Sequence, residues 1–128
     1  MAFPKGTLFP EEDQQIGSLG KALGHPARVH ILRLLKRDGY LYMRDIVRQL
    51  PLSEGTVTGH LRKLRHAGFI TVAEEGLYNG YALDIRGLQL MEEVQRVFLG
   101  ELLEGTAGSG GVRQGDATVF HKITPGQV

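Results

Sequence analysis

Apolar residues recur at helical spacing over most of this chain, and two early segments show the pattern first. Residues 14–23 carry apolar side chains three or four positions apart, which predicts a helix. A second helix is expected to begin at Pro26, because proline is tolerated in a first turn, and to end at Gly39. The buried face of this second helix is expected to hold Val29, Leu32 and Leu35.

Two more helices are predicted on either side of Pro51. The helix before this proline is short, and its apolar residues are Ile46, Val47 and Leu50. After the break, Ser53 is suited to cap the next helix and Gly68 to end it. Apolar residues at positions i, i+4 and i+7 give this later helix one buried stripe, formed by Val57, Leu61 and Leu64.

The spacing of apolar residues changes to a strand pattern after this helix and then returns to a helical pattern. Residues 69–72 and 81–83 have strand character, and a turn is expected between them. The residues that supply turn chemistry are Gly76, Asn79 and Gly80. A long amphipathic helix follows and reaches about residue 103.

These elements predict one mainly α-helical domain with a small β-hairpin, over residues 14–104. The expected order is four helices, the hairpin and a last helix. Residues 1–13 contain two prolines and an acidic run, and we expect an N-terminal arm there. Residues 105–128 form a Gly-rich tail, in which residues 118–123 alternate weakly, as an isolated strand would.

Composition narrows the class of protein. The chain has 128 residues and no tryptophan, so its core must be small and aliphatic, which makes dimerisation an early expectation. It has no cysteine, which excludes disulfides, thiolate metal sites and cysteine nucleophiles. We find neither a signal peptide nor an apolar run long enough to span a membrane. We therefore expect a soluble, cytoplasmic protein with no membrane partner.

Charge is distributed unevenly along the chain. Residues 43–68 hold five basic and two acidic residues, a net charge of +3, whereas residues 69–105 hold two basic and seven acidic residues, a net charge of −5. The basic middle segment suggests an anionic partner, although two solvated faces of opposite sign explain the same counts.

The short helix, the break at Pro51-Leu52 and the capped helix have the spacing of a helix-turn-helix, and the hairpin follows as a wing. Here the sequence resembles the ArsR-type (ArsR/SmtB-like) winged helix-turn-helix repressors over residues 19–103. The resemblance is carried by KALGHPARVHILRLL, by GTVTGHLRKLRHAGFI and by the glycine-containing hairpin before YALD. It implies a homodimeric transcriptional repressor that binds a palindromic operator in double-stranded DNA and is released by an inducer.

The helix after Ser53 is the expected recognition helix, because the second helix of such a pair lies in the major groove. Its side facing away from the apolar stripe holds Gly55, Gly59, Arg62 and Lys63. Arginine and lysine there can neutralise phosphates, and Tyr78 in the wing can hydrogen-bond the sugar-phosphate backbone. The candidate DNA contacts are Arg44, Ser53, Glu54, Gly55, Thr56, Thr58, Gly59, His60, Arg62, Lys63, Tyr78 and Asn79.

The resemblance also shows where this chain departs from the family. Base-reading positions would fall on Glu54, Gly55, Thr58 and Gly59, where the family usually has Gln or Ser, Ser, Ser and His. Thr58 alone is close to that pattern, so base specificity is expected to be modest. Glu54 either accepts a hydrogen bond from cytosine or only favours the first helical turn.

Two further positions leave alternatives open. His60 matches the family's histidine before leucine, and it either contacts DNA or packs at the flank of the helix. Family wings often carry arginine or lysine at the tip, whereas this wing carries Glu74 and Glu75 and no basic residue. That difference argues against insertion of the wing into the minor groove and favours a weakly engaged wing.

The first and last helices are expected to form the dimer interface. Their apolar residues at this interface would be Ile16, Leu19, Leu23, Met91, Val94, Phe98 and Leu102. Many family members sense metal through cysteines, or through histidines on the last helix, and this chain has neither there. We expect no metal site and no cofactor, and we expect a non-thiol signal. This signal is a small-molecule inducer, the abundance of the protein itself or a partner protein, and the sequence does not separate the three.

The sequence motifs also bear on two other functional classes, an enzyme and a protein-binding module. No nucleophile elbow, phosphate loop or paired-carboxylate motif is present, so we expect no enzyme. The alternative to a repressor is a winged-helix module that binds protein and has weak or no specific DNA binding. The acidic wing and the two glycines on the recognition helix favour that alternative.

Overall fold

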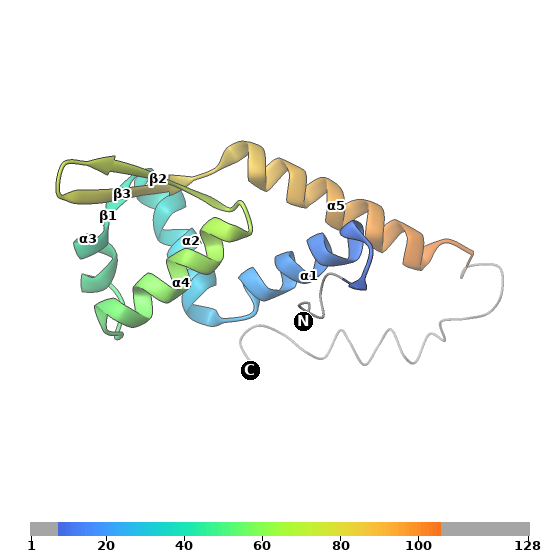
Figure 1. Cartoon of the computed structure of the whole chain (residues 1–128), viewed down its shortest axis with the longest axis horizontal. Coiled ribbons are helices and arrows are strands. Elements are labelled where there is room, and N and C mark those ends of the chain that lie inside the picture. Colours follow the sequence, from blue (N-terminus) through green and yellow to red (C-terminus); the bar gives the residue numbers. More distant parts are fainter. Residues whose placement is uncertain (1–7, 106–128) are drawn as a thin grey trace. The chain divides into compact units, whose positions relative to one another are not determined.

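The computed structural model describes residues 8–105. Five helices and a small antiparallel sheet make up this part of the chain (Figure 1), which confirms the predicted fold class. The elements are α1 (Glu11–Leu23), α2 (Pro26–Asp38), β1 (Leu41–Tyr42), α3 (Met43–Arg48), α4 (Glu54–His66), β2 (Ile70–Glu75), β3 (Tyr78–Leu83) and α5 (Ile85–Leu103). The predicted tail and most of the predicted arm lie outside the described residues.

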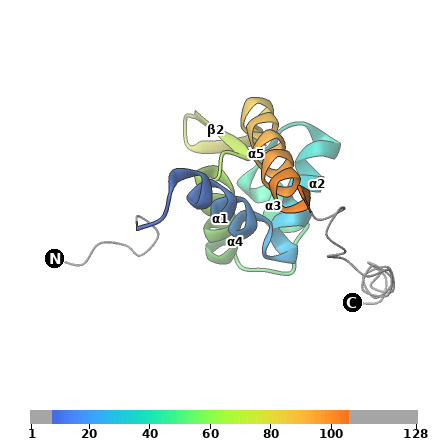
Figure 2. The same cartoon turned by 90° about the vertical axis from the view of Figure 1, so that its right-hand side faces the viewer.

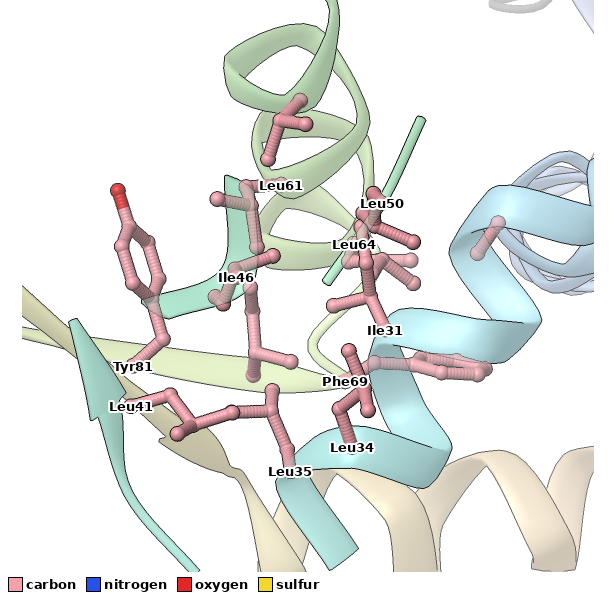
Figure 3. Packing of buried hydrophobic residues seen from close by; sticks show 14 residues of the cluster. Ile31, Leu34, Leu35, Leu41, Ile46, Leu50, Leu61, Leu64, Phe69 and Tyr81 are labelled. Atoms are coloured by element: carbon pink, nitrogen blue, oxygen red, sulfur yellow. The ribbon is translucent and has the colours of Figure 1, made fainter. Parts of the chain in front are cut away.

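The chain divides into two units, Met1–Gln95 and Arg96–Val128, and the hydrophobic core lies in the first. Side chains of α2, α3 and α4 meet there with residues of the sheet, as Figure 3 shows for Ile31, Ile46, Leu64 and Tyr81. The predicted stripe of α4 is confirmed, because Val57, Leu61 and Leu64 are all buried. This core holds α4 in place.

The prediction of which residues of α2 are buried is wrong in part. Leu35 is buried, but the other buried apolar residues of this helix are Ile31 and Leu34, whereas Val29 and Leu32 are half-buried. Apolar residues surround most of this helix, so their spacing alone does not select one face. The first helix also differs from the prediction, because α1 begins at Glu11 and includes the acidic run assigned to the arm.

The sheet has a third strand that the hairpin prediction missed. The strand order is β1-β3-β2, and Leu41 of β1 pairs with Tyr81 of β3. β1 is only two residues long, which is too short for an alternating pattern to show in the sequence.

The hairpin turn is tighter than predicted. It is made at Gly76, whose φ of 63° lies in the left-handed region, and Asn79 and Gly80 belong to β3. β2 and β3 pair from Ile70–Leu83 to Glu75–Tyr78 and extend from the helices as a wing (Figure 1). The turn prediction for Asn79 and Gly80 is therefore wrong.

Two glycines allow the corner after α4 to approach the first turns of α5. Gly68 has a φ of 81° and ends α4 as expected. A Cβ on Gly87 would overlap the backbone carbonyl of Gly68, so no larger residue fits at position 87 without a backbone shift. This contact explains a glycine inside a helix, which is otherwise unfavourable.

Candidate nucleic-acid interface

The N-terminus of α4 is fixed by Ser53. Its Oγ accepts a hydrogen bond from the backbone N–H of Thr56 at 3.2 Å and donates to Thr56 Oγ1 at 2.9 Å. This confirms the predicted cap, which satisfies one of the free N–H groups of the first turn. Both hydroxyls are exposed, so Ser53 and Thr56 remain candidates for phosphate contact in addition to their structural role.

The two sides of α4 differ sharply in exposure. Glu54, Gly55, Arg62 and Lys63 are exposed, and Thr58 and Gly59 are half-buried, whereas the stripe of Val57, Leu61 and Leu64 is buried. Thr58 Oγ1 donates to the backbone carbonyl of Glu54 at 2.8 Å, so its proton is used within the helix and its oxygen remains an acceptor.

Neither glycine of α4 is required by packing in this chain. A Cβ built on Gly55 or on Gly59 meets no other atom within 4 Å. Glycine in a helix costs roughly 1 kcal/mol relative to alanine, and nothing in the described chain offsets that cost. The two glycines therefore leave a bare strip of backbone along the exposed side of the helix.

His60 lies in the core rather than on the exposed side. It is 9% exposed, and its Nδ1 is 3.0 Å from Nη1 of Arg28. Because the guanidinium is a donor only, Nδ1 accepts and the imidazole is neutral with its proton on Nε2. Burial, with the nearby charges of His25, Arg28 and Lys63, lowers the pKa of His60. Of the two alternatives, the structure supports the packed histidine, and we remove His60 from the candidate DNA contacts.

Arg28 is a buried residue that the sequence analysis missed. It is 6% exposed and donates from Nε to the carbonyl of Ala22 at 2.9 Å and from Nη2 to that of Lys21 at 2.8 Å. These carbonyls belong to the last turn of α1, where the helix dipole favours a positive charge. Arg28 therefore joins the end of α1 to the middle of α4 through His60.

The wing is supported by a group of tyrosines around Arg44. The Arg44 Cζ lies 5.6 Å from the centroid of the Tyr78 ring and 5.9 Å from that of Tyr42. Tyr42 Oη donates to Glu75 Oε2 at 2.9 Å, and this hydrogen bond is the main cause of a raised pKa of Tyr42. One of the two wing carboxylates is thus bound within the protein. Tyr42 was not predicted, although it stands in the segment LYMRD beside Arg44.

Several predicted contacts line one hollow of about 570 Å³ between α3, the start of α4 and the wing. The hollow brings together Arg44, Glu54, Thr58, Tyr78 and Asn79, and adds Arg48. A neighbouring hollow of about 350 Å³ includes Arg62, Arg65 and Glu74. Lys63 lies elsewhere, in a hollow against α1. The structure therefore groups Arg44, Thr58, Arg62 and the wing, and separates Lys63 and His60 from them.

The predicted interface residues differ in exposure. Leu23 and Leu102 are exposed, whereas the others are half-buried, and Leu19 and Met91 pack against the core. None of the 19 residues of α5 is buried. Between residues 8 and 105, no helix is long and apolar enough to cross a membrane, and no group of three or more His, Asp or Glu residues is arranged to hold a metal ion.

A helix-turn-helix followed by a wing, with a basic and polar face on the second helix, defines the class of winged helix-turn-helix proteins. Comparison with known proteins places the chain more narrowly. Residues 25–72 match the model of the arsR family of bacterial regulatory proteins. An uncharacterised HTH-type transcriptional regulator of Methanocaldococcus jannaschii is 32% identical over 71 residues, covering 56% of this chain and 80% of that protein. The chain belongs to the ArsR family of transcriptional regulators.

Other relatives agree with this assignment. A CadC homolog of Staphylococcus aureus, described as a cadmium resistance transcriptional regulatory protein, is 28% identical over 74% of this chain and 77% of its own length. An ArsR-like transcriptional regulator from Rhodococcus sp. RHA1 has a TM-score of 0.63 at 21% identity, over 73% of this chain and 88% of that chain. HlyU from Vibrio cholerae has a TM-score of 0.54 at 23% identity, over 71% of this chain and 99% of that chain. The two solved structures support the fold.

Proposed function

We propose that the protein is a homodimeric repressor that binds a two-fold symmetric operator, with α4 in the major groove. The observation that carries this proposal is the grouping of Arg44, Thr58, Arg62 and the wing beside the exposed side of α4. Arg62 and Arg44 would contact phosphates on the two sides of the helix. Thr58 and Glu54 are the side chains available for base edges.

The wing would contact the backbone and not enter the minor groove. Its described residues carry no positive charge of their own, and Arg44 from α3 lies against the Tyr78 ring. Arg44 therefore supplies the cation that the wing lacks. Tyr78 and Asn79 would add hydrogen bonds to sugar or phosphate oxygens.

Exposed apolar residues on α5 support the proposal of a dimer. They are Ile85, Leu90, Val97, Leu99, Leu102 and Leu103. Large apolar side chains on one helix indicate a protein partner, and a second copy of the chain would bury them. In such a dimer the two α4 helices would reach successive major grooves about 34 Å apart.

The signal that releases the operator is proposed to be a small molecule and not a thiol-bound metal. The Staphylococcus aureus relative is described by cadmium resistance, but this chain has no cysteine with which to form thiolate ligands.

The test is an anisotropy titration of labelled DNA from upstream of the gene against a shuffled sequence, at two salt concentrations. We expect tighter binding to the upstream DNA and an affinity that falls with salt, by a slope of about −0.9 per neutralised phosphate. Equal and weak binding to both sequences would contradict the proposal.

That outcome would favour the second candidate, a winged-helix module that binds protein. Glu74 is exposed in the wing, and Leu77 at its tip is 97% exposed. An acidic surface with one exposed leucine is unusual for a DNA contact and suits a basic protein partner.

A further inference from the structure

A hollow of about 690 Å³ lies between α1 and α4, apart from the residues grouped around the wing. Figures 1 and 2 show α1 beside α4, and both helices belong to the same unit. Its volume falls in the range of about 300–1,000 Å³ that is usual for small-molecule sites. Phe9, Gly17 and Ala22 give the hollow an apolar lining.

Three basic residues line this hollow. Lys21 comes from the last turn of α1, and Lys63 and His66 come from the last turn of α4. Within residues 8–105 neither Lys21 nor Lys63 forms an ion pair with a carboxylate. Asp13 is the acidic residue of the lining, and it belongs to the first turn of α1.

We propose that this hollow binds a small amphipathic organic anion, which has an apolar body and one carboxylate or sulfonate group. The anionic group would lie between Lys21 and Lys63, and the apolar body would lie along Gly17 and Phe9. A single carboxylate in the lining makes a cation a poorer match than an anion. The absence of a side chain at Gly17 leaves the hollow open, because a Cβ there meets no atom within 4 Å.

Occupancy of the hollow would weaken DNA binding. This part of the inference rests on the proposed function, because it requires α4 to bind DNA. Lys63 is a candidate phosphate contact that also lines the hollow, so an anion there competes for the same ammonium group. The ligand would also tie the last turn of α4 to α1. The hollow is therefore the proposed inducer site.

The test of the site uses 8-anilinonaphthalene-1-sulfonate, an amphipathic aromatic anion, as the probe, and follows its fluorescence on the full chain without DNA. Gly17→Leu fills the hollow and should weaken probe binding at least about tenfold. Gly20→Leu is the matched control, because Gly20 is in the same helix, has equally open space and does not line the hollow. Gly20→Leu should bind the probe as tightly as the natural protein does.

Two lysine variants provide a second test of the site. Lys63→Gln should weaken probe binding several-fold, and Lys36→Gln, an exposed lysine of α2 away from the hollow, should not. Circular dichroism establishes that each variant is folded. If Gly17→Leu and Lys63→Gln both bind the probe as tightly as the natural protein does, the proposed site is wrong. The probe would then bind elsewhere, for example on exposed leucines of α5.

The coupling to DNA is measured separately. Saturating probe should weaken binding of labelled upstream DNA, and saturating DNA should weaken probe binding by the same factor. Unchanged DNA affinity in the presence of bound probe would overturn the inducer role and leave the site itself supported. If the protein without probe binds no DNA, the proposed function fails, whereas the site is judged by the probe titrations alone.

Discussion

Arg28 and His60 are hydrogen-bonded at 3.0 Å in the interior, 32 residues apart in the sequence. The same guanidinium holds the two carbonyls at the end of α1. A buried cation is therefore balanced by helix carbonyls and a neutral imidazole, and its hydrogen-bond partners within residues 8–105 include no carboxylate. The arrangement fixes α4 relative to α1, so that changes at α1 reach the proposed DNA surface.

Removal of Arg28 should be strongly destabilising. Arg28→Ala leaves the buried carbonyl of Ala22 and Nδ1 of His60 without this donor, and each such group costs about 1–3 kcal/mol. Arg33→Ala is the matched control, because Arg33 is an exposed arginine of the same helix, and should change the free energy of unfolding by less than about 0.5 kcal/mol. Urea unfolding measures both, and equal stability of the two variants would refute the role of Arg28.

The lowered pKa of His60 predicts acid sensitivity. The unfolded chain binds a proton at this residue near pH 6.5, whereas the folded protein does so only at lower pH. The folded state therefore binds fewer protons below pH 6.5, and the stabilising contribution is complete above that pH and is lost as the pH falls through the folded pKa.

His60→Asn separates this effect from other titrations. Asparagine offers an oxygen acceptor to Arg28 and does not titrate in this range. The decrease in stability between pH 7 and pH 5, measured by urea unfolding, should be smaller in the variant than in the natural protein. An identical pH dependence would show that His60 does not titrate with a lowered pKa.

Two helical glycines should respond to alanine with opposite signs. Gly59→Ala should stabilise the protein by about 1 kcal/mol, because its Cβ enters open space. Gly87→Ala should destabilise it, by about 1–3 kcal/mol, because its Cβ overlaps the carbonyl of Gly68 and the backbone must move. Thermal unfolding checks both, and a destabilised Gly59→Ala would contradict the open geometry.

The same variant reports on DNA docking. If the stabilised Gly59→Ala protein binds DNA less tightly, the DNA backbone approaches α4 closely at this position. If it binds equally or more tightly, the glycine is a gap in the interface.

The proposed dimer is tested at an exposed leucine of α5. Leu102 is 58% exposed, so Leu102→Glu costs an isolated chain little, but it places charge in an apolar interface. Light scattering after gel filtration should show a monomer for Leu102→Glu and a dimer for Glu101→Gln, an exposed neighbour. A dimeric Leu102→Glu protein would place the interface elsewhere.

The sequence predicted the elements that obey simple rules and missed those set by tertiary contacts. The stripe of α4, its Ser53 cap and its Gly68 stop follow from spacing and local chemistry. The face of α2 was ambiguous because apolar residues surround that helix. The hydrogen bond from Arg28 to His60 joins residues distant in sequence, and no local pattern marks an arginine that will be buried.

The surface was harder to predict than the fold. Helical phase selected Arg62 and Lys63 together, yet the structure places Arg62 near the wing and Lys63 against α1. That separation depends on how α1 packs on α4. The helical phase of α4 alone carries no information about this packing. The same packing creates the hollow proposed as a ligand site.

The central claim is that the exposed side of α4 and the adjoining Arg44 bind operator DNA. Its most direct test compares Arg62→Glu and Arg44→Glu with Arg33→Glu in anisotropy titrations of the upstream DNA at one salt concentration. Loss of one charge-assisted contact costs about 1.5–3 kcal/mol, so the first two variants should bind at least about tenfold more weakly. Arg33→Glu lies on α2 and should stay within about twofold of the natural protein. Equal affinities for all three variants would contradict the account.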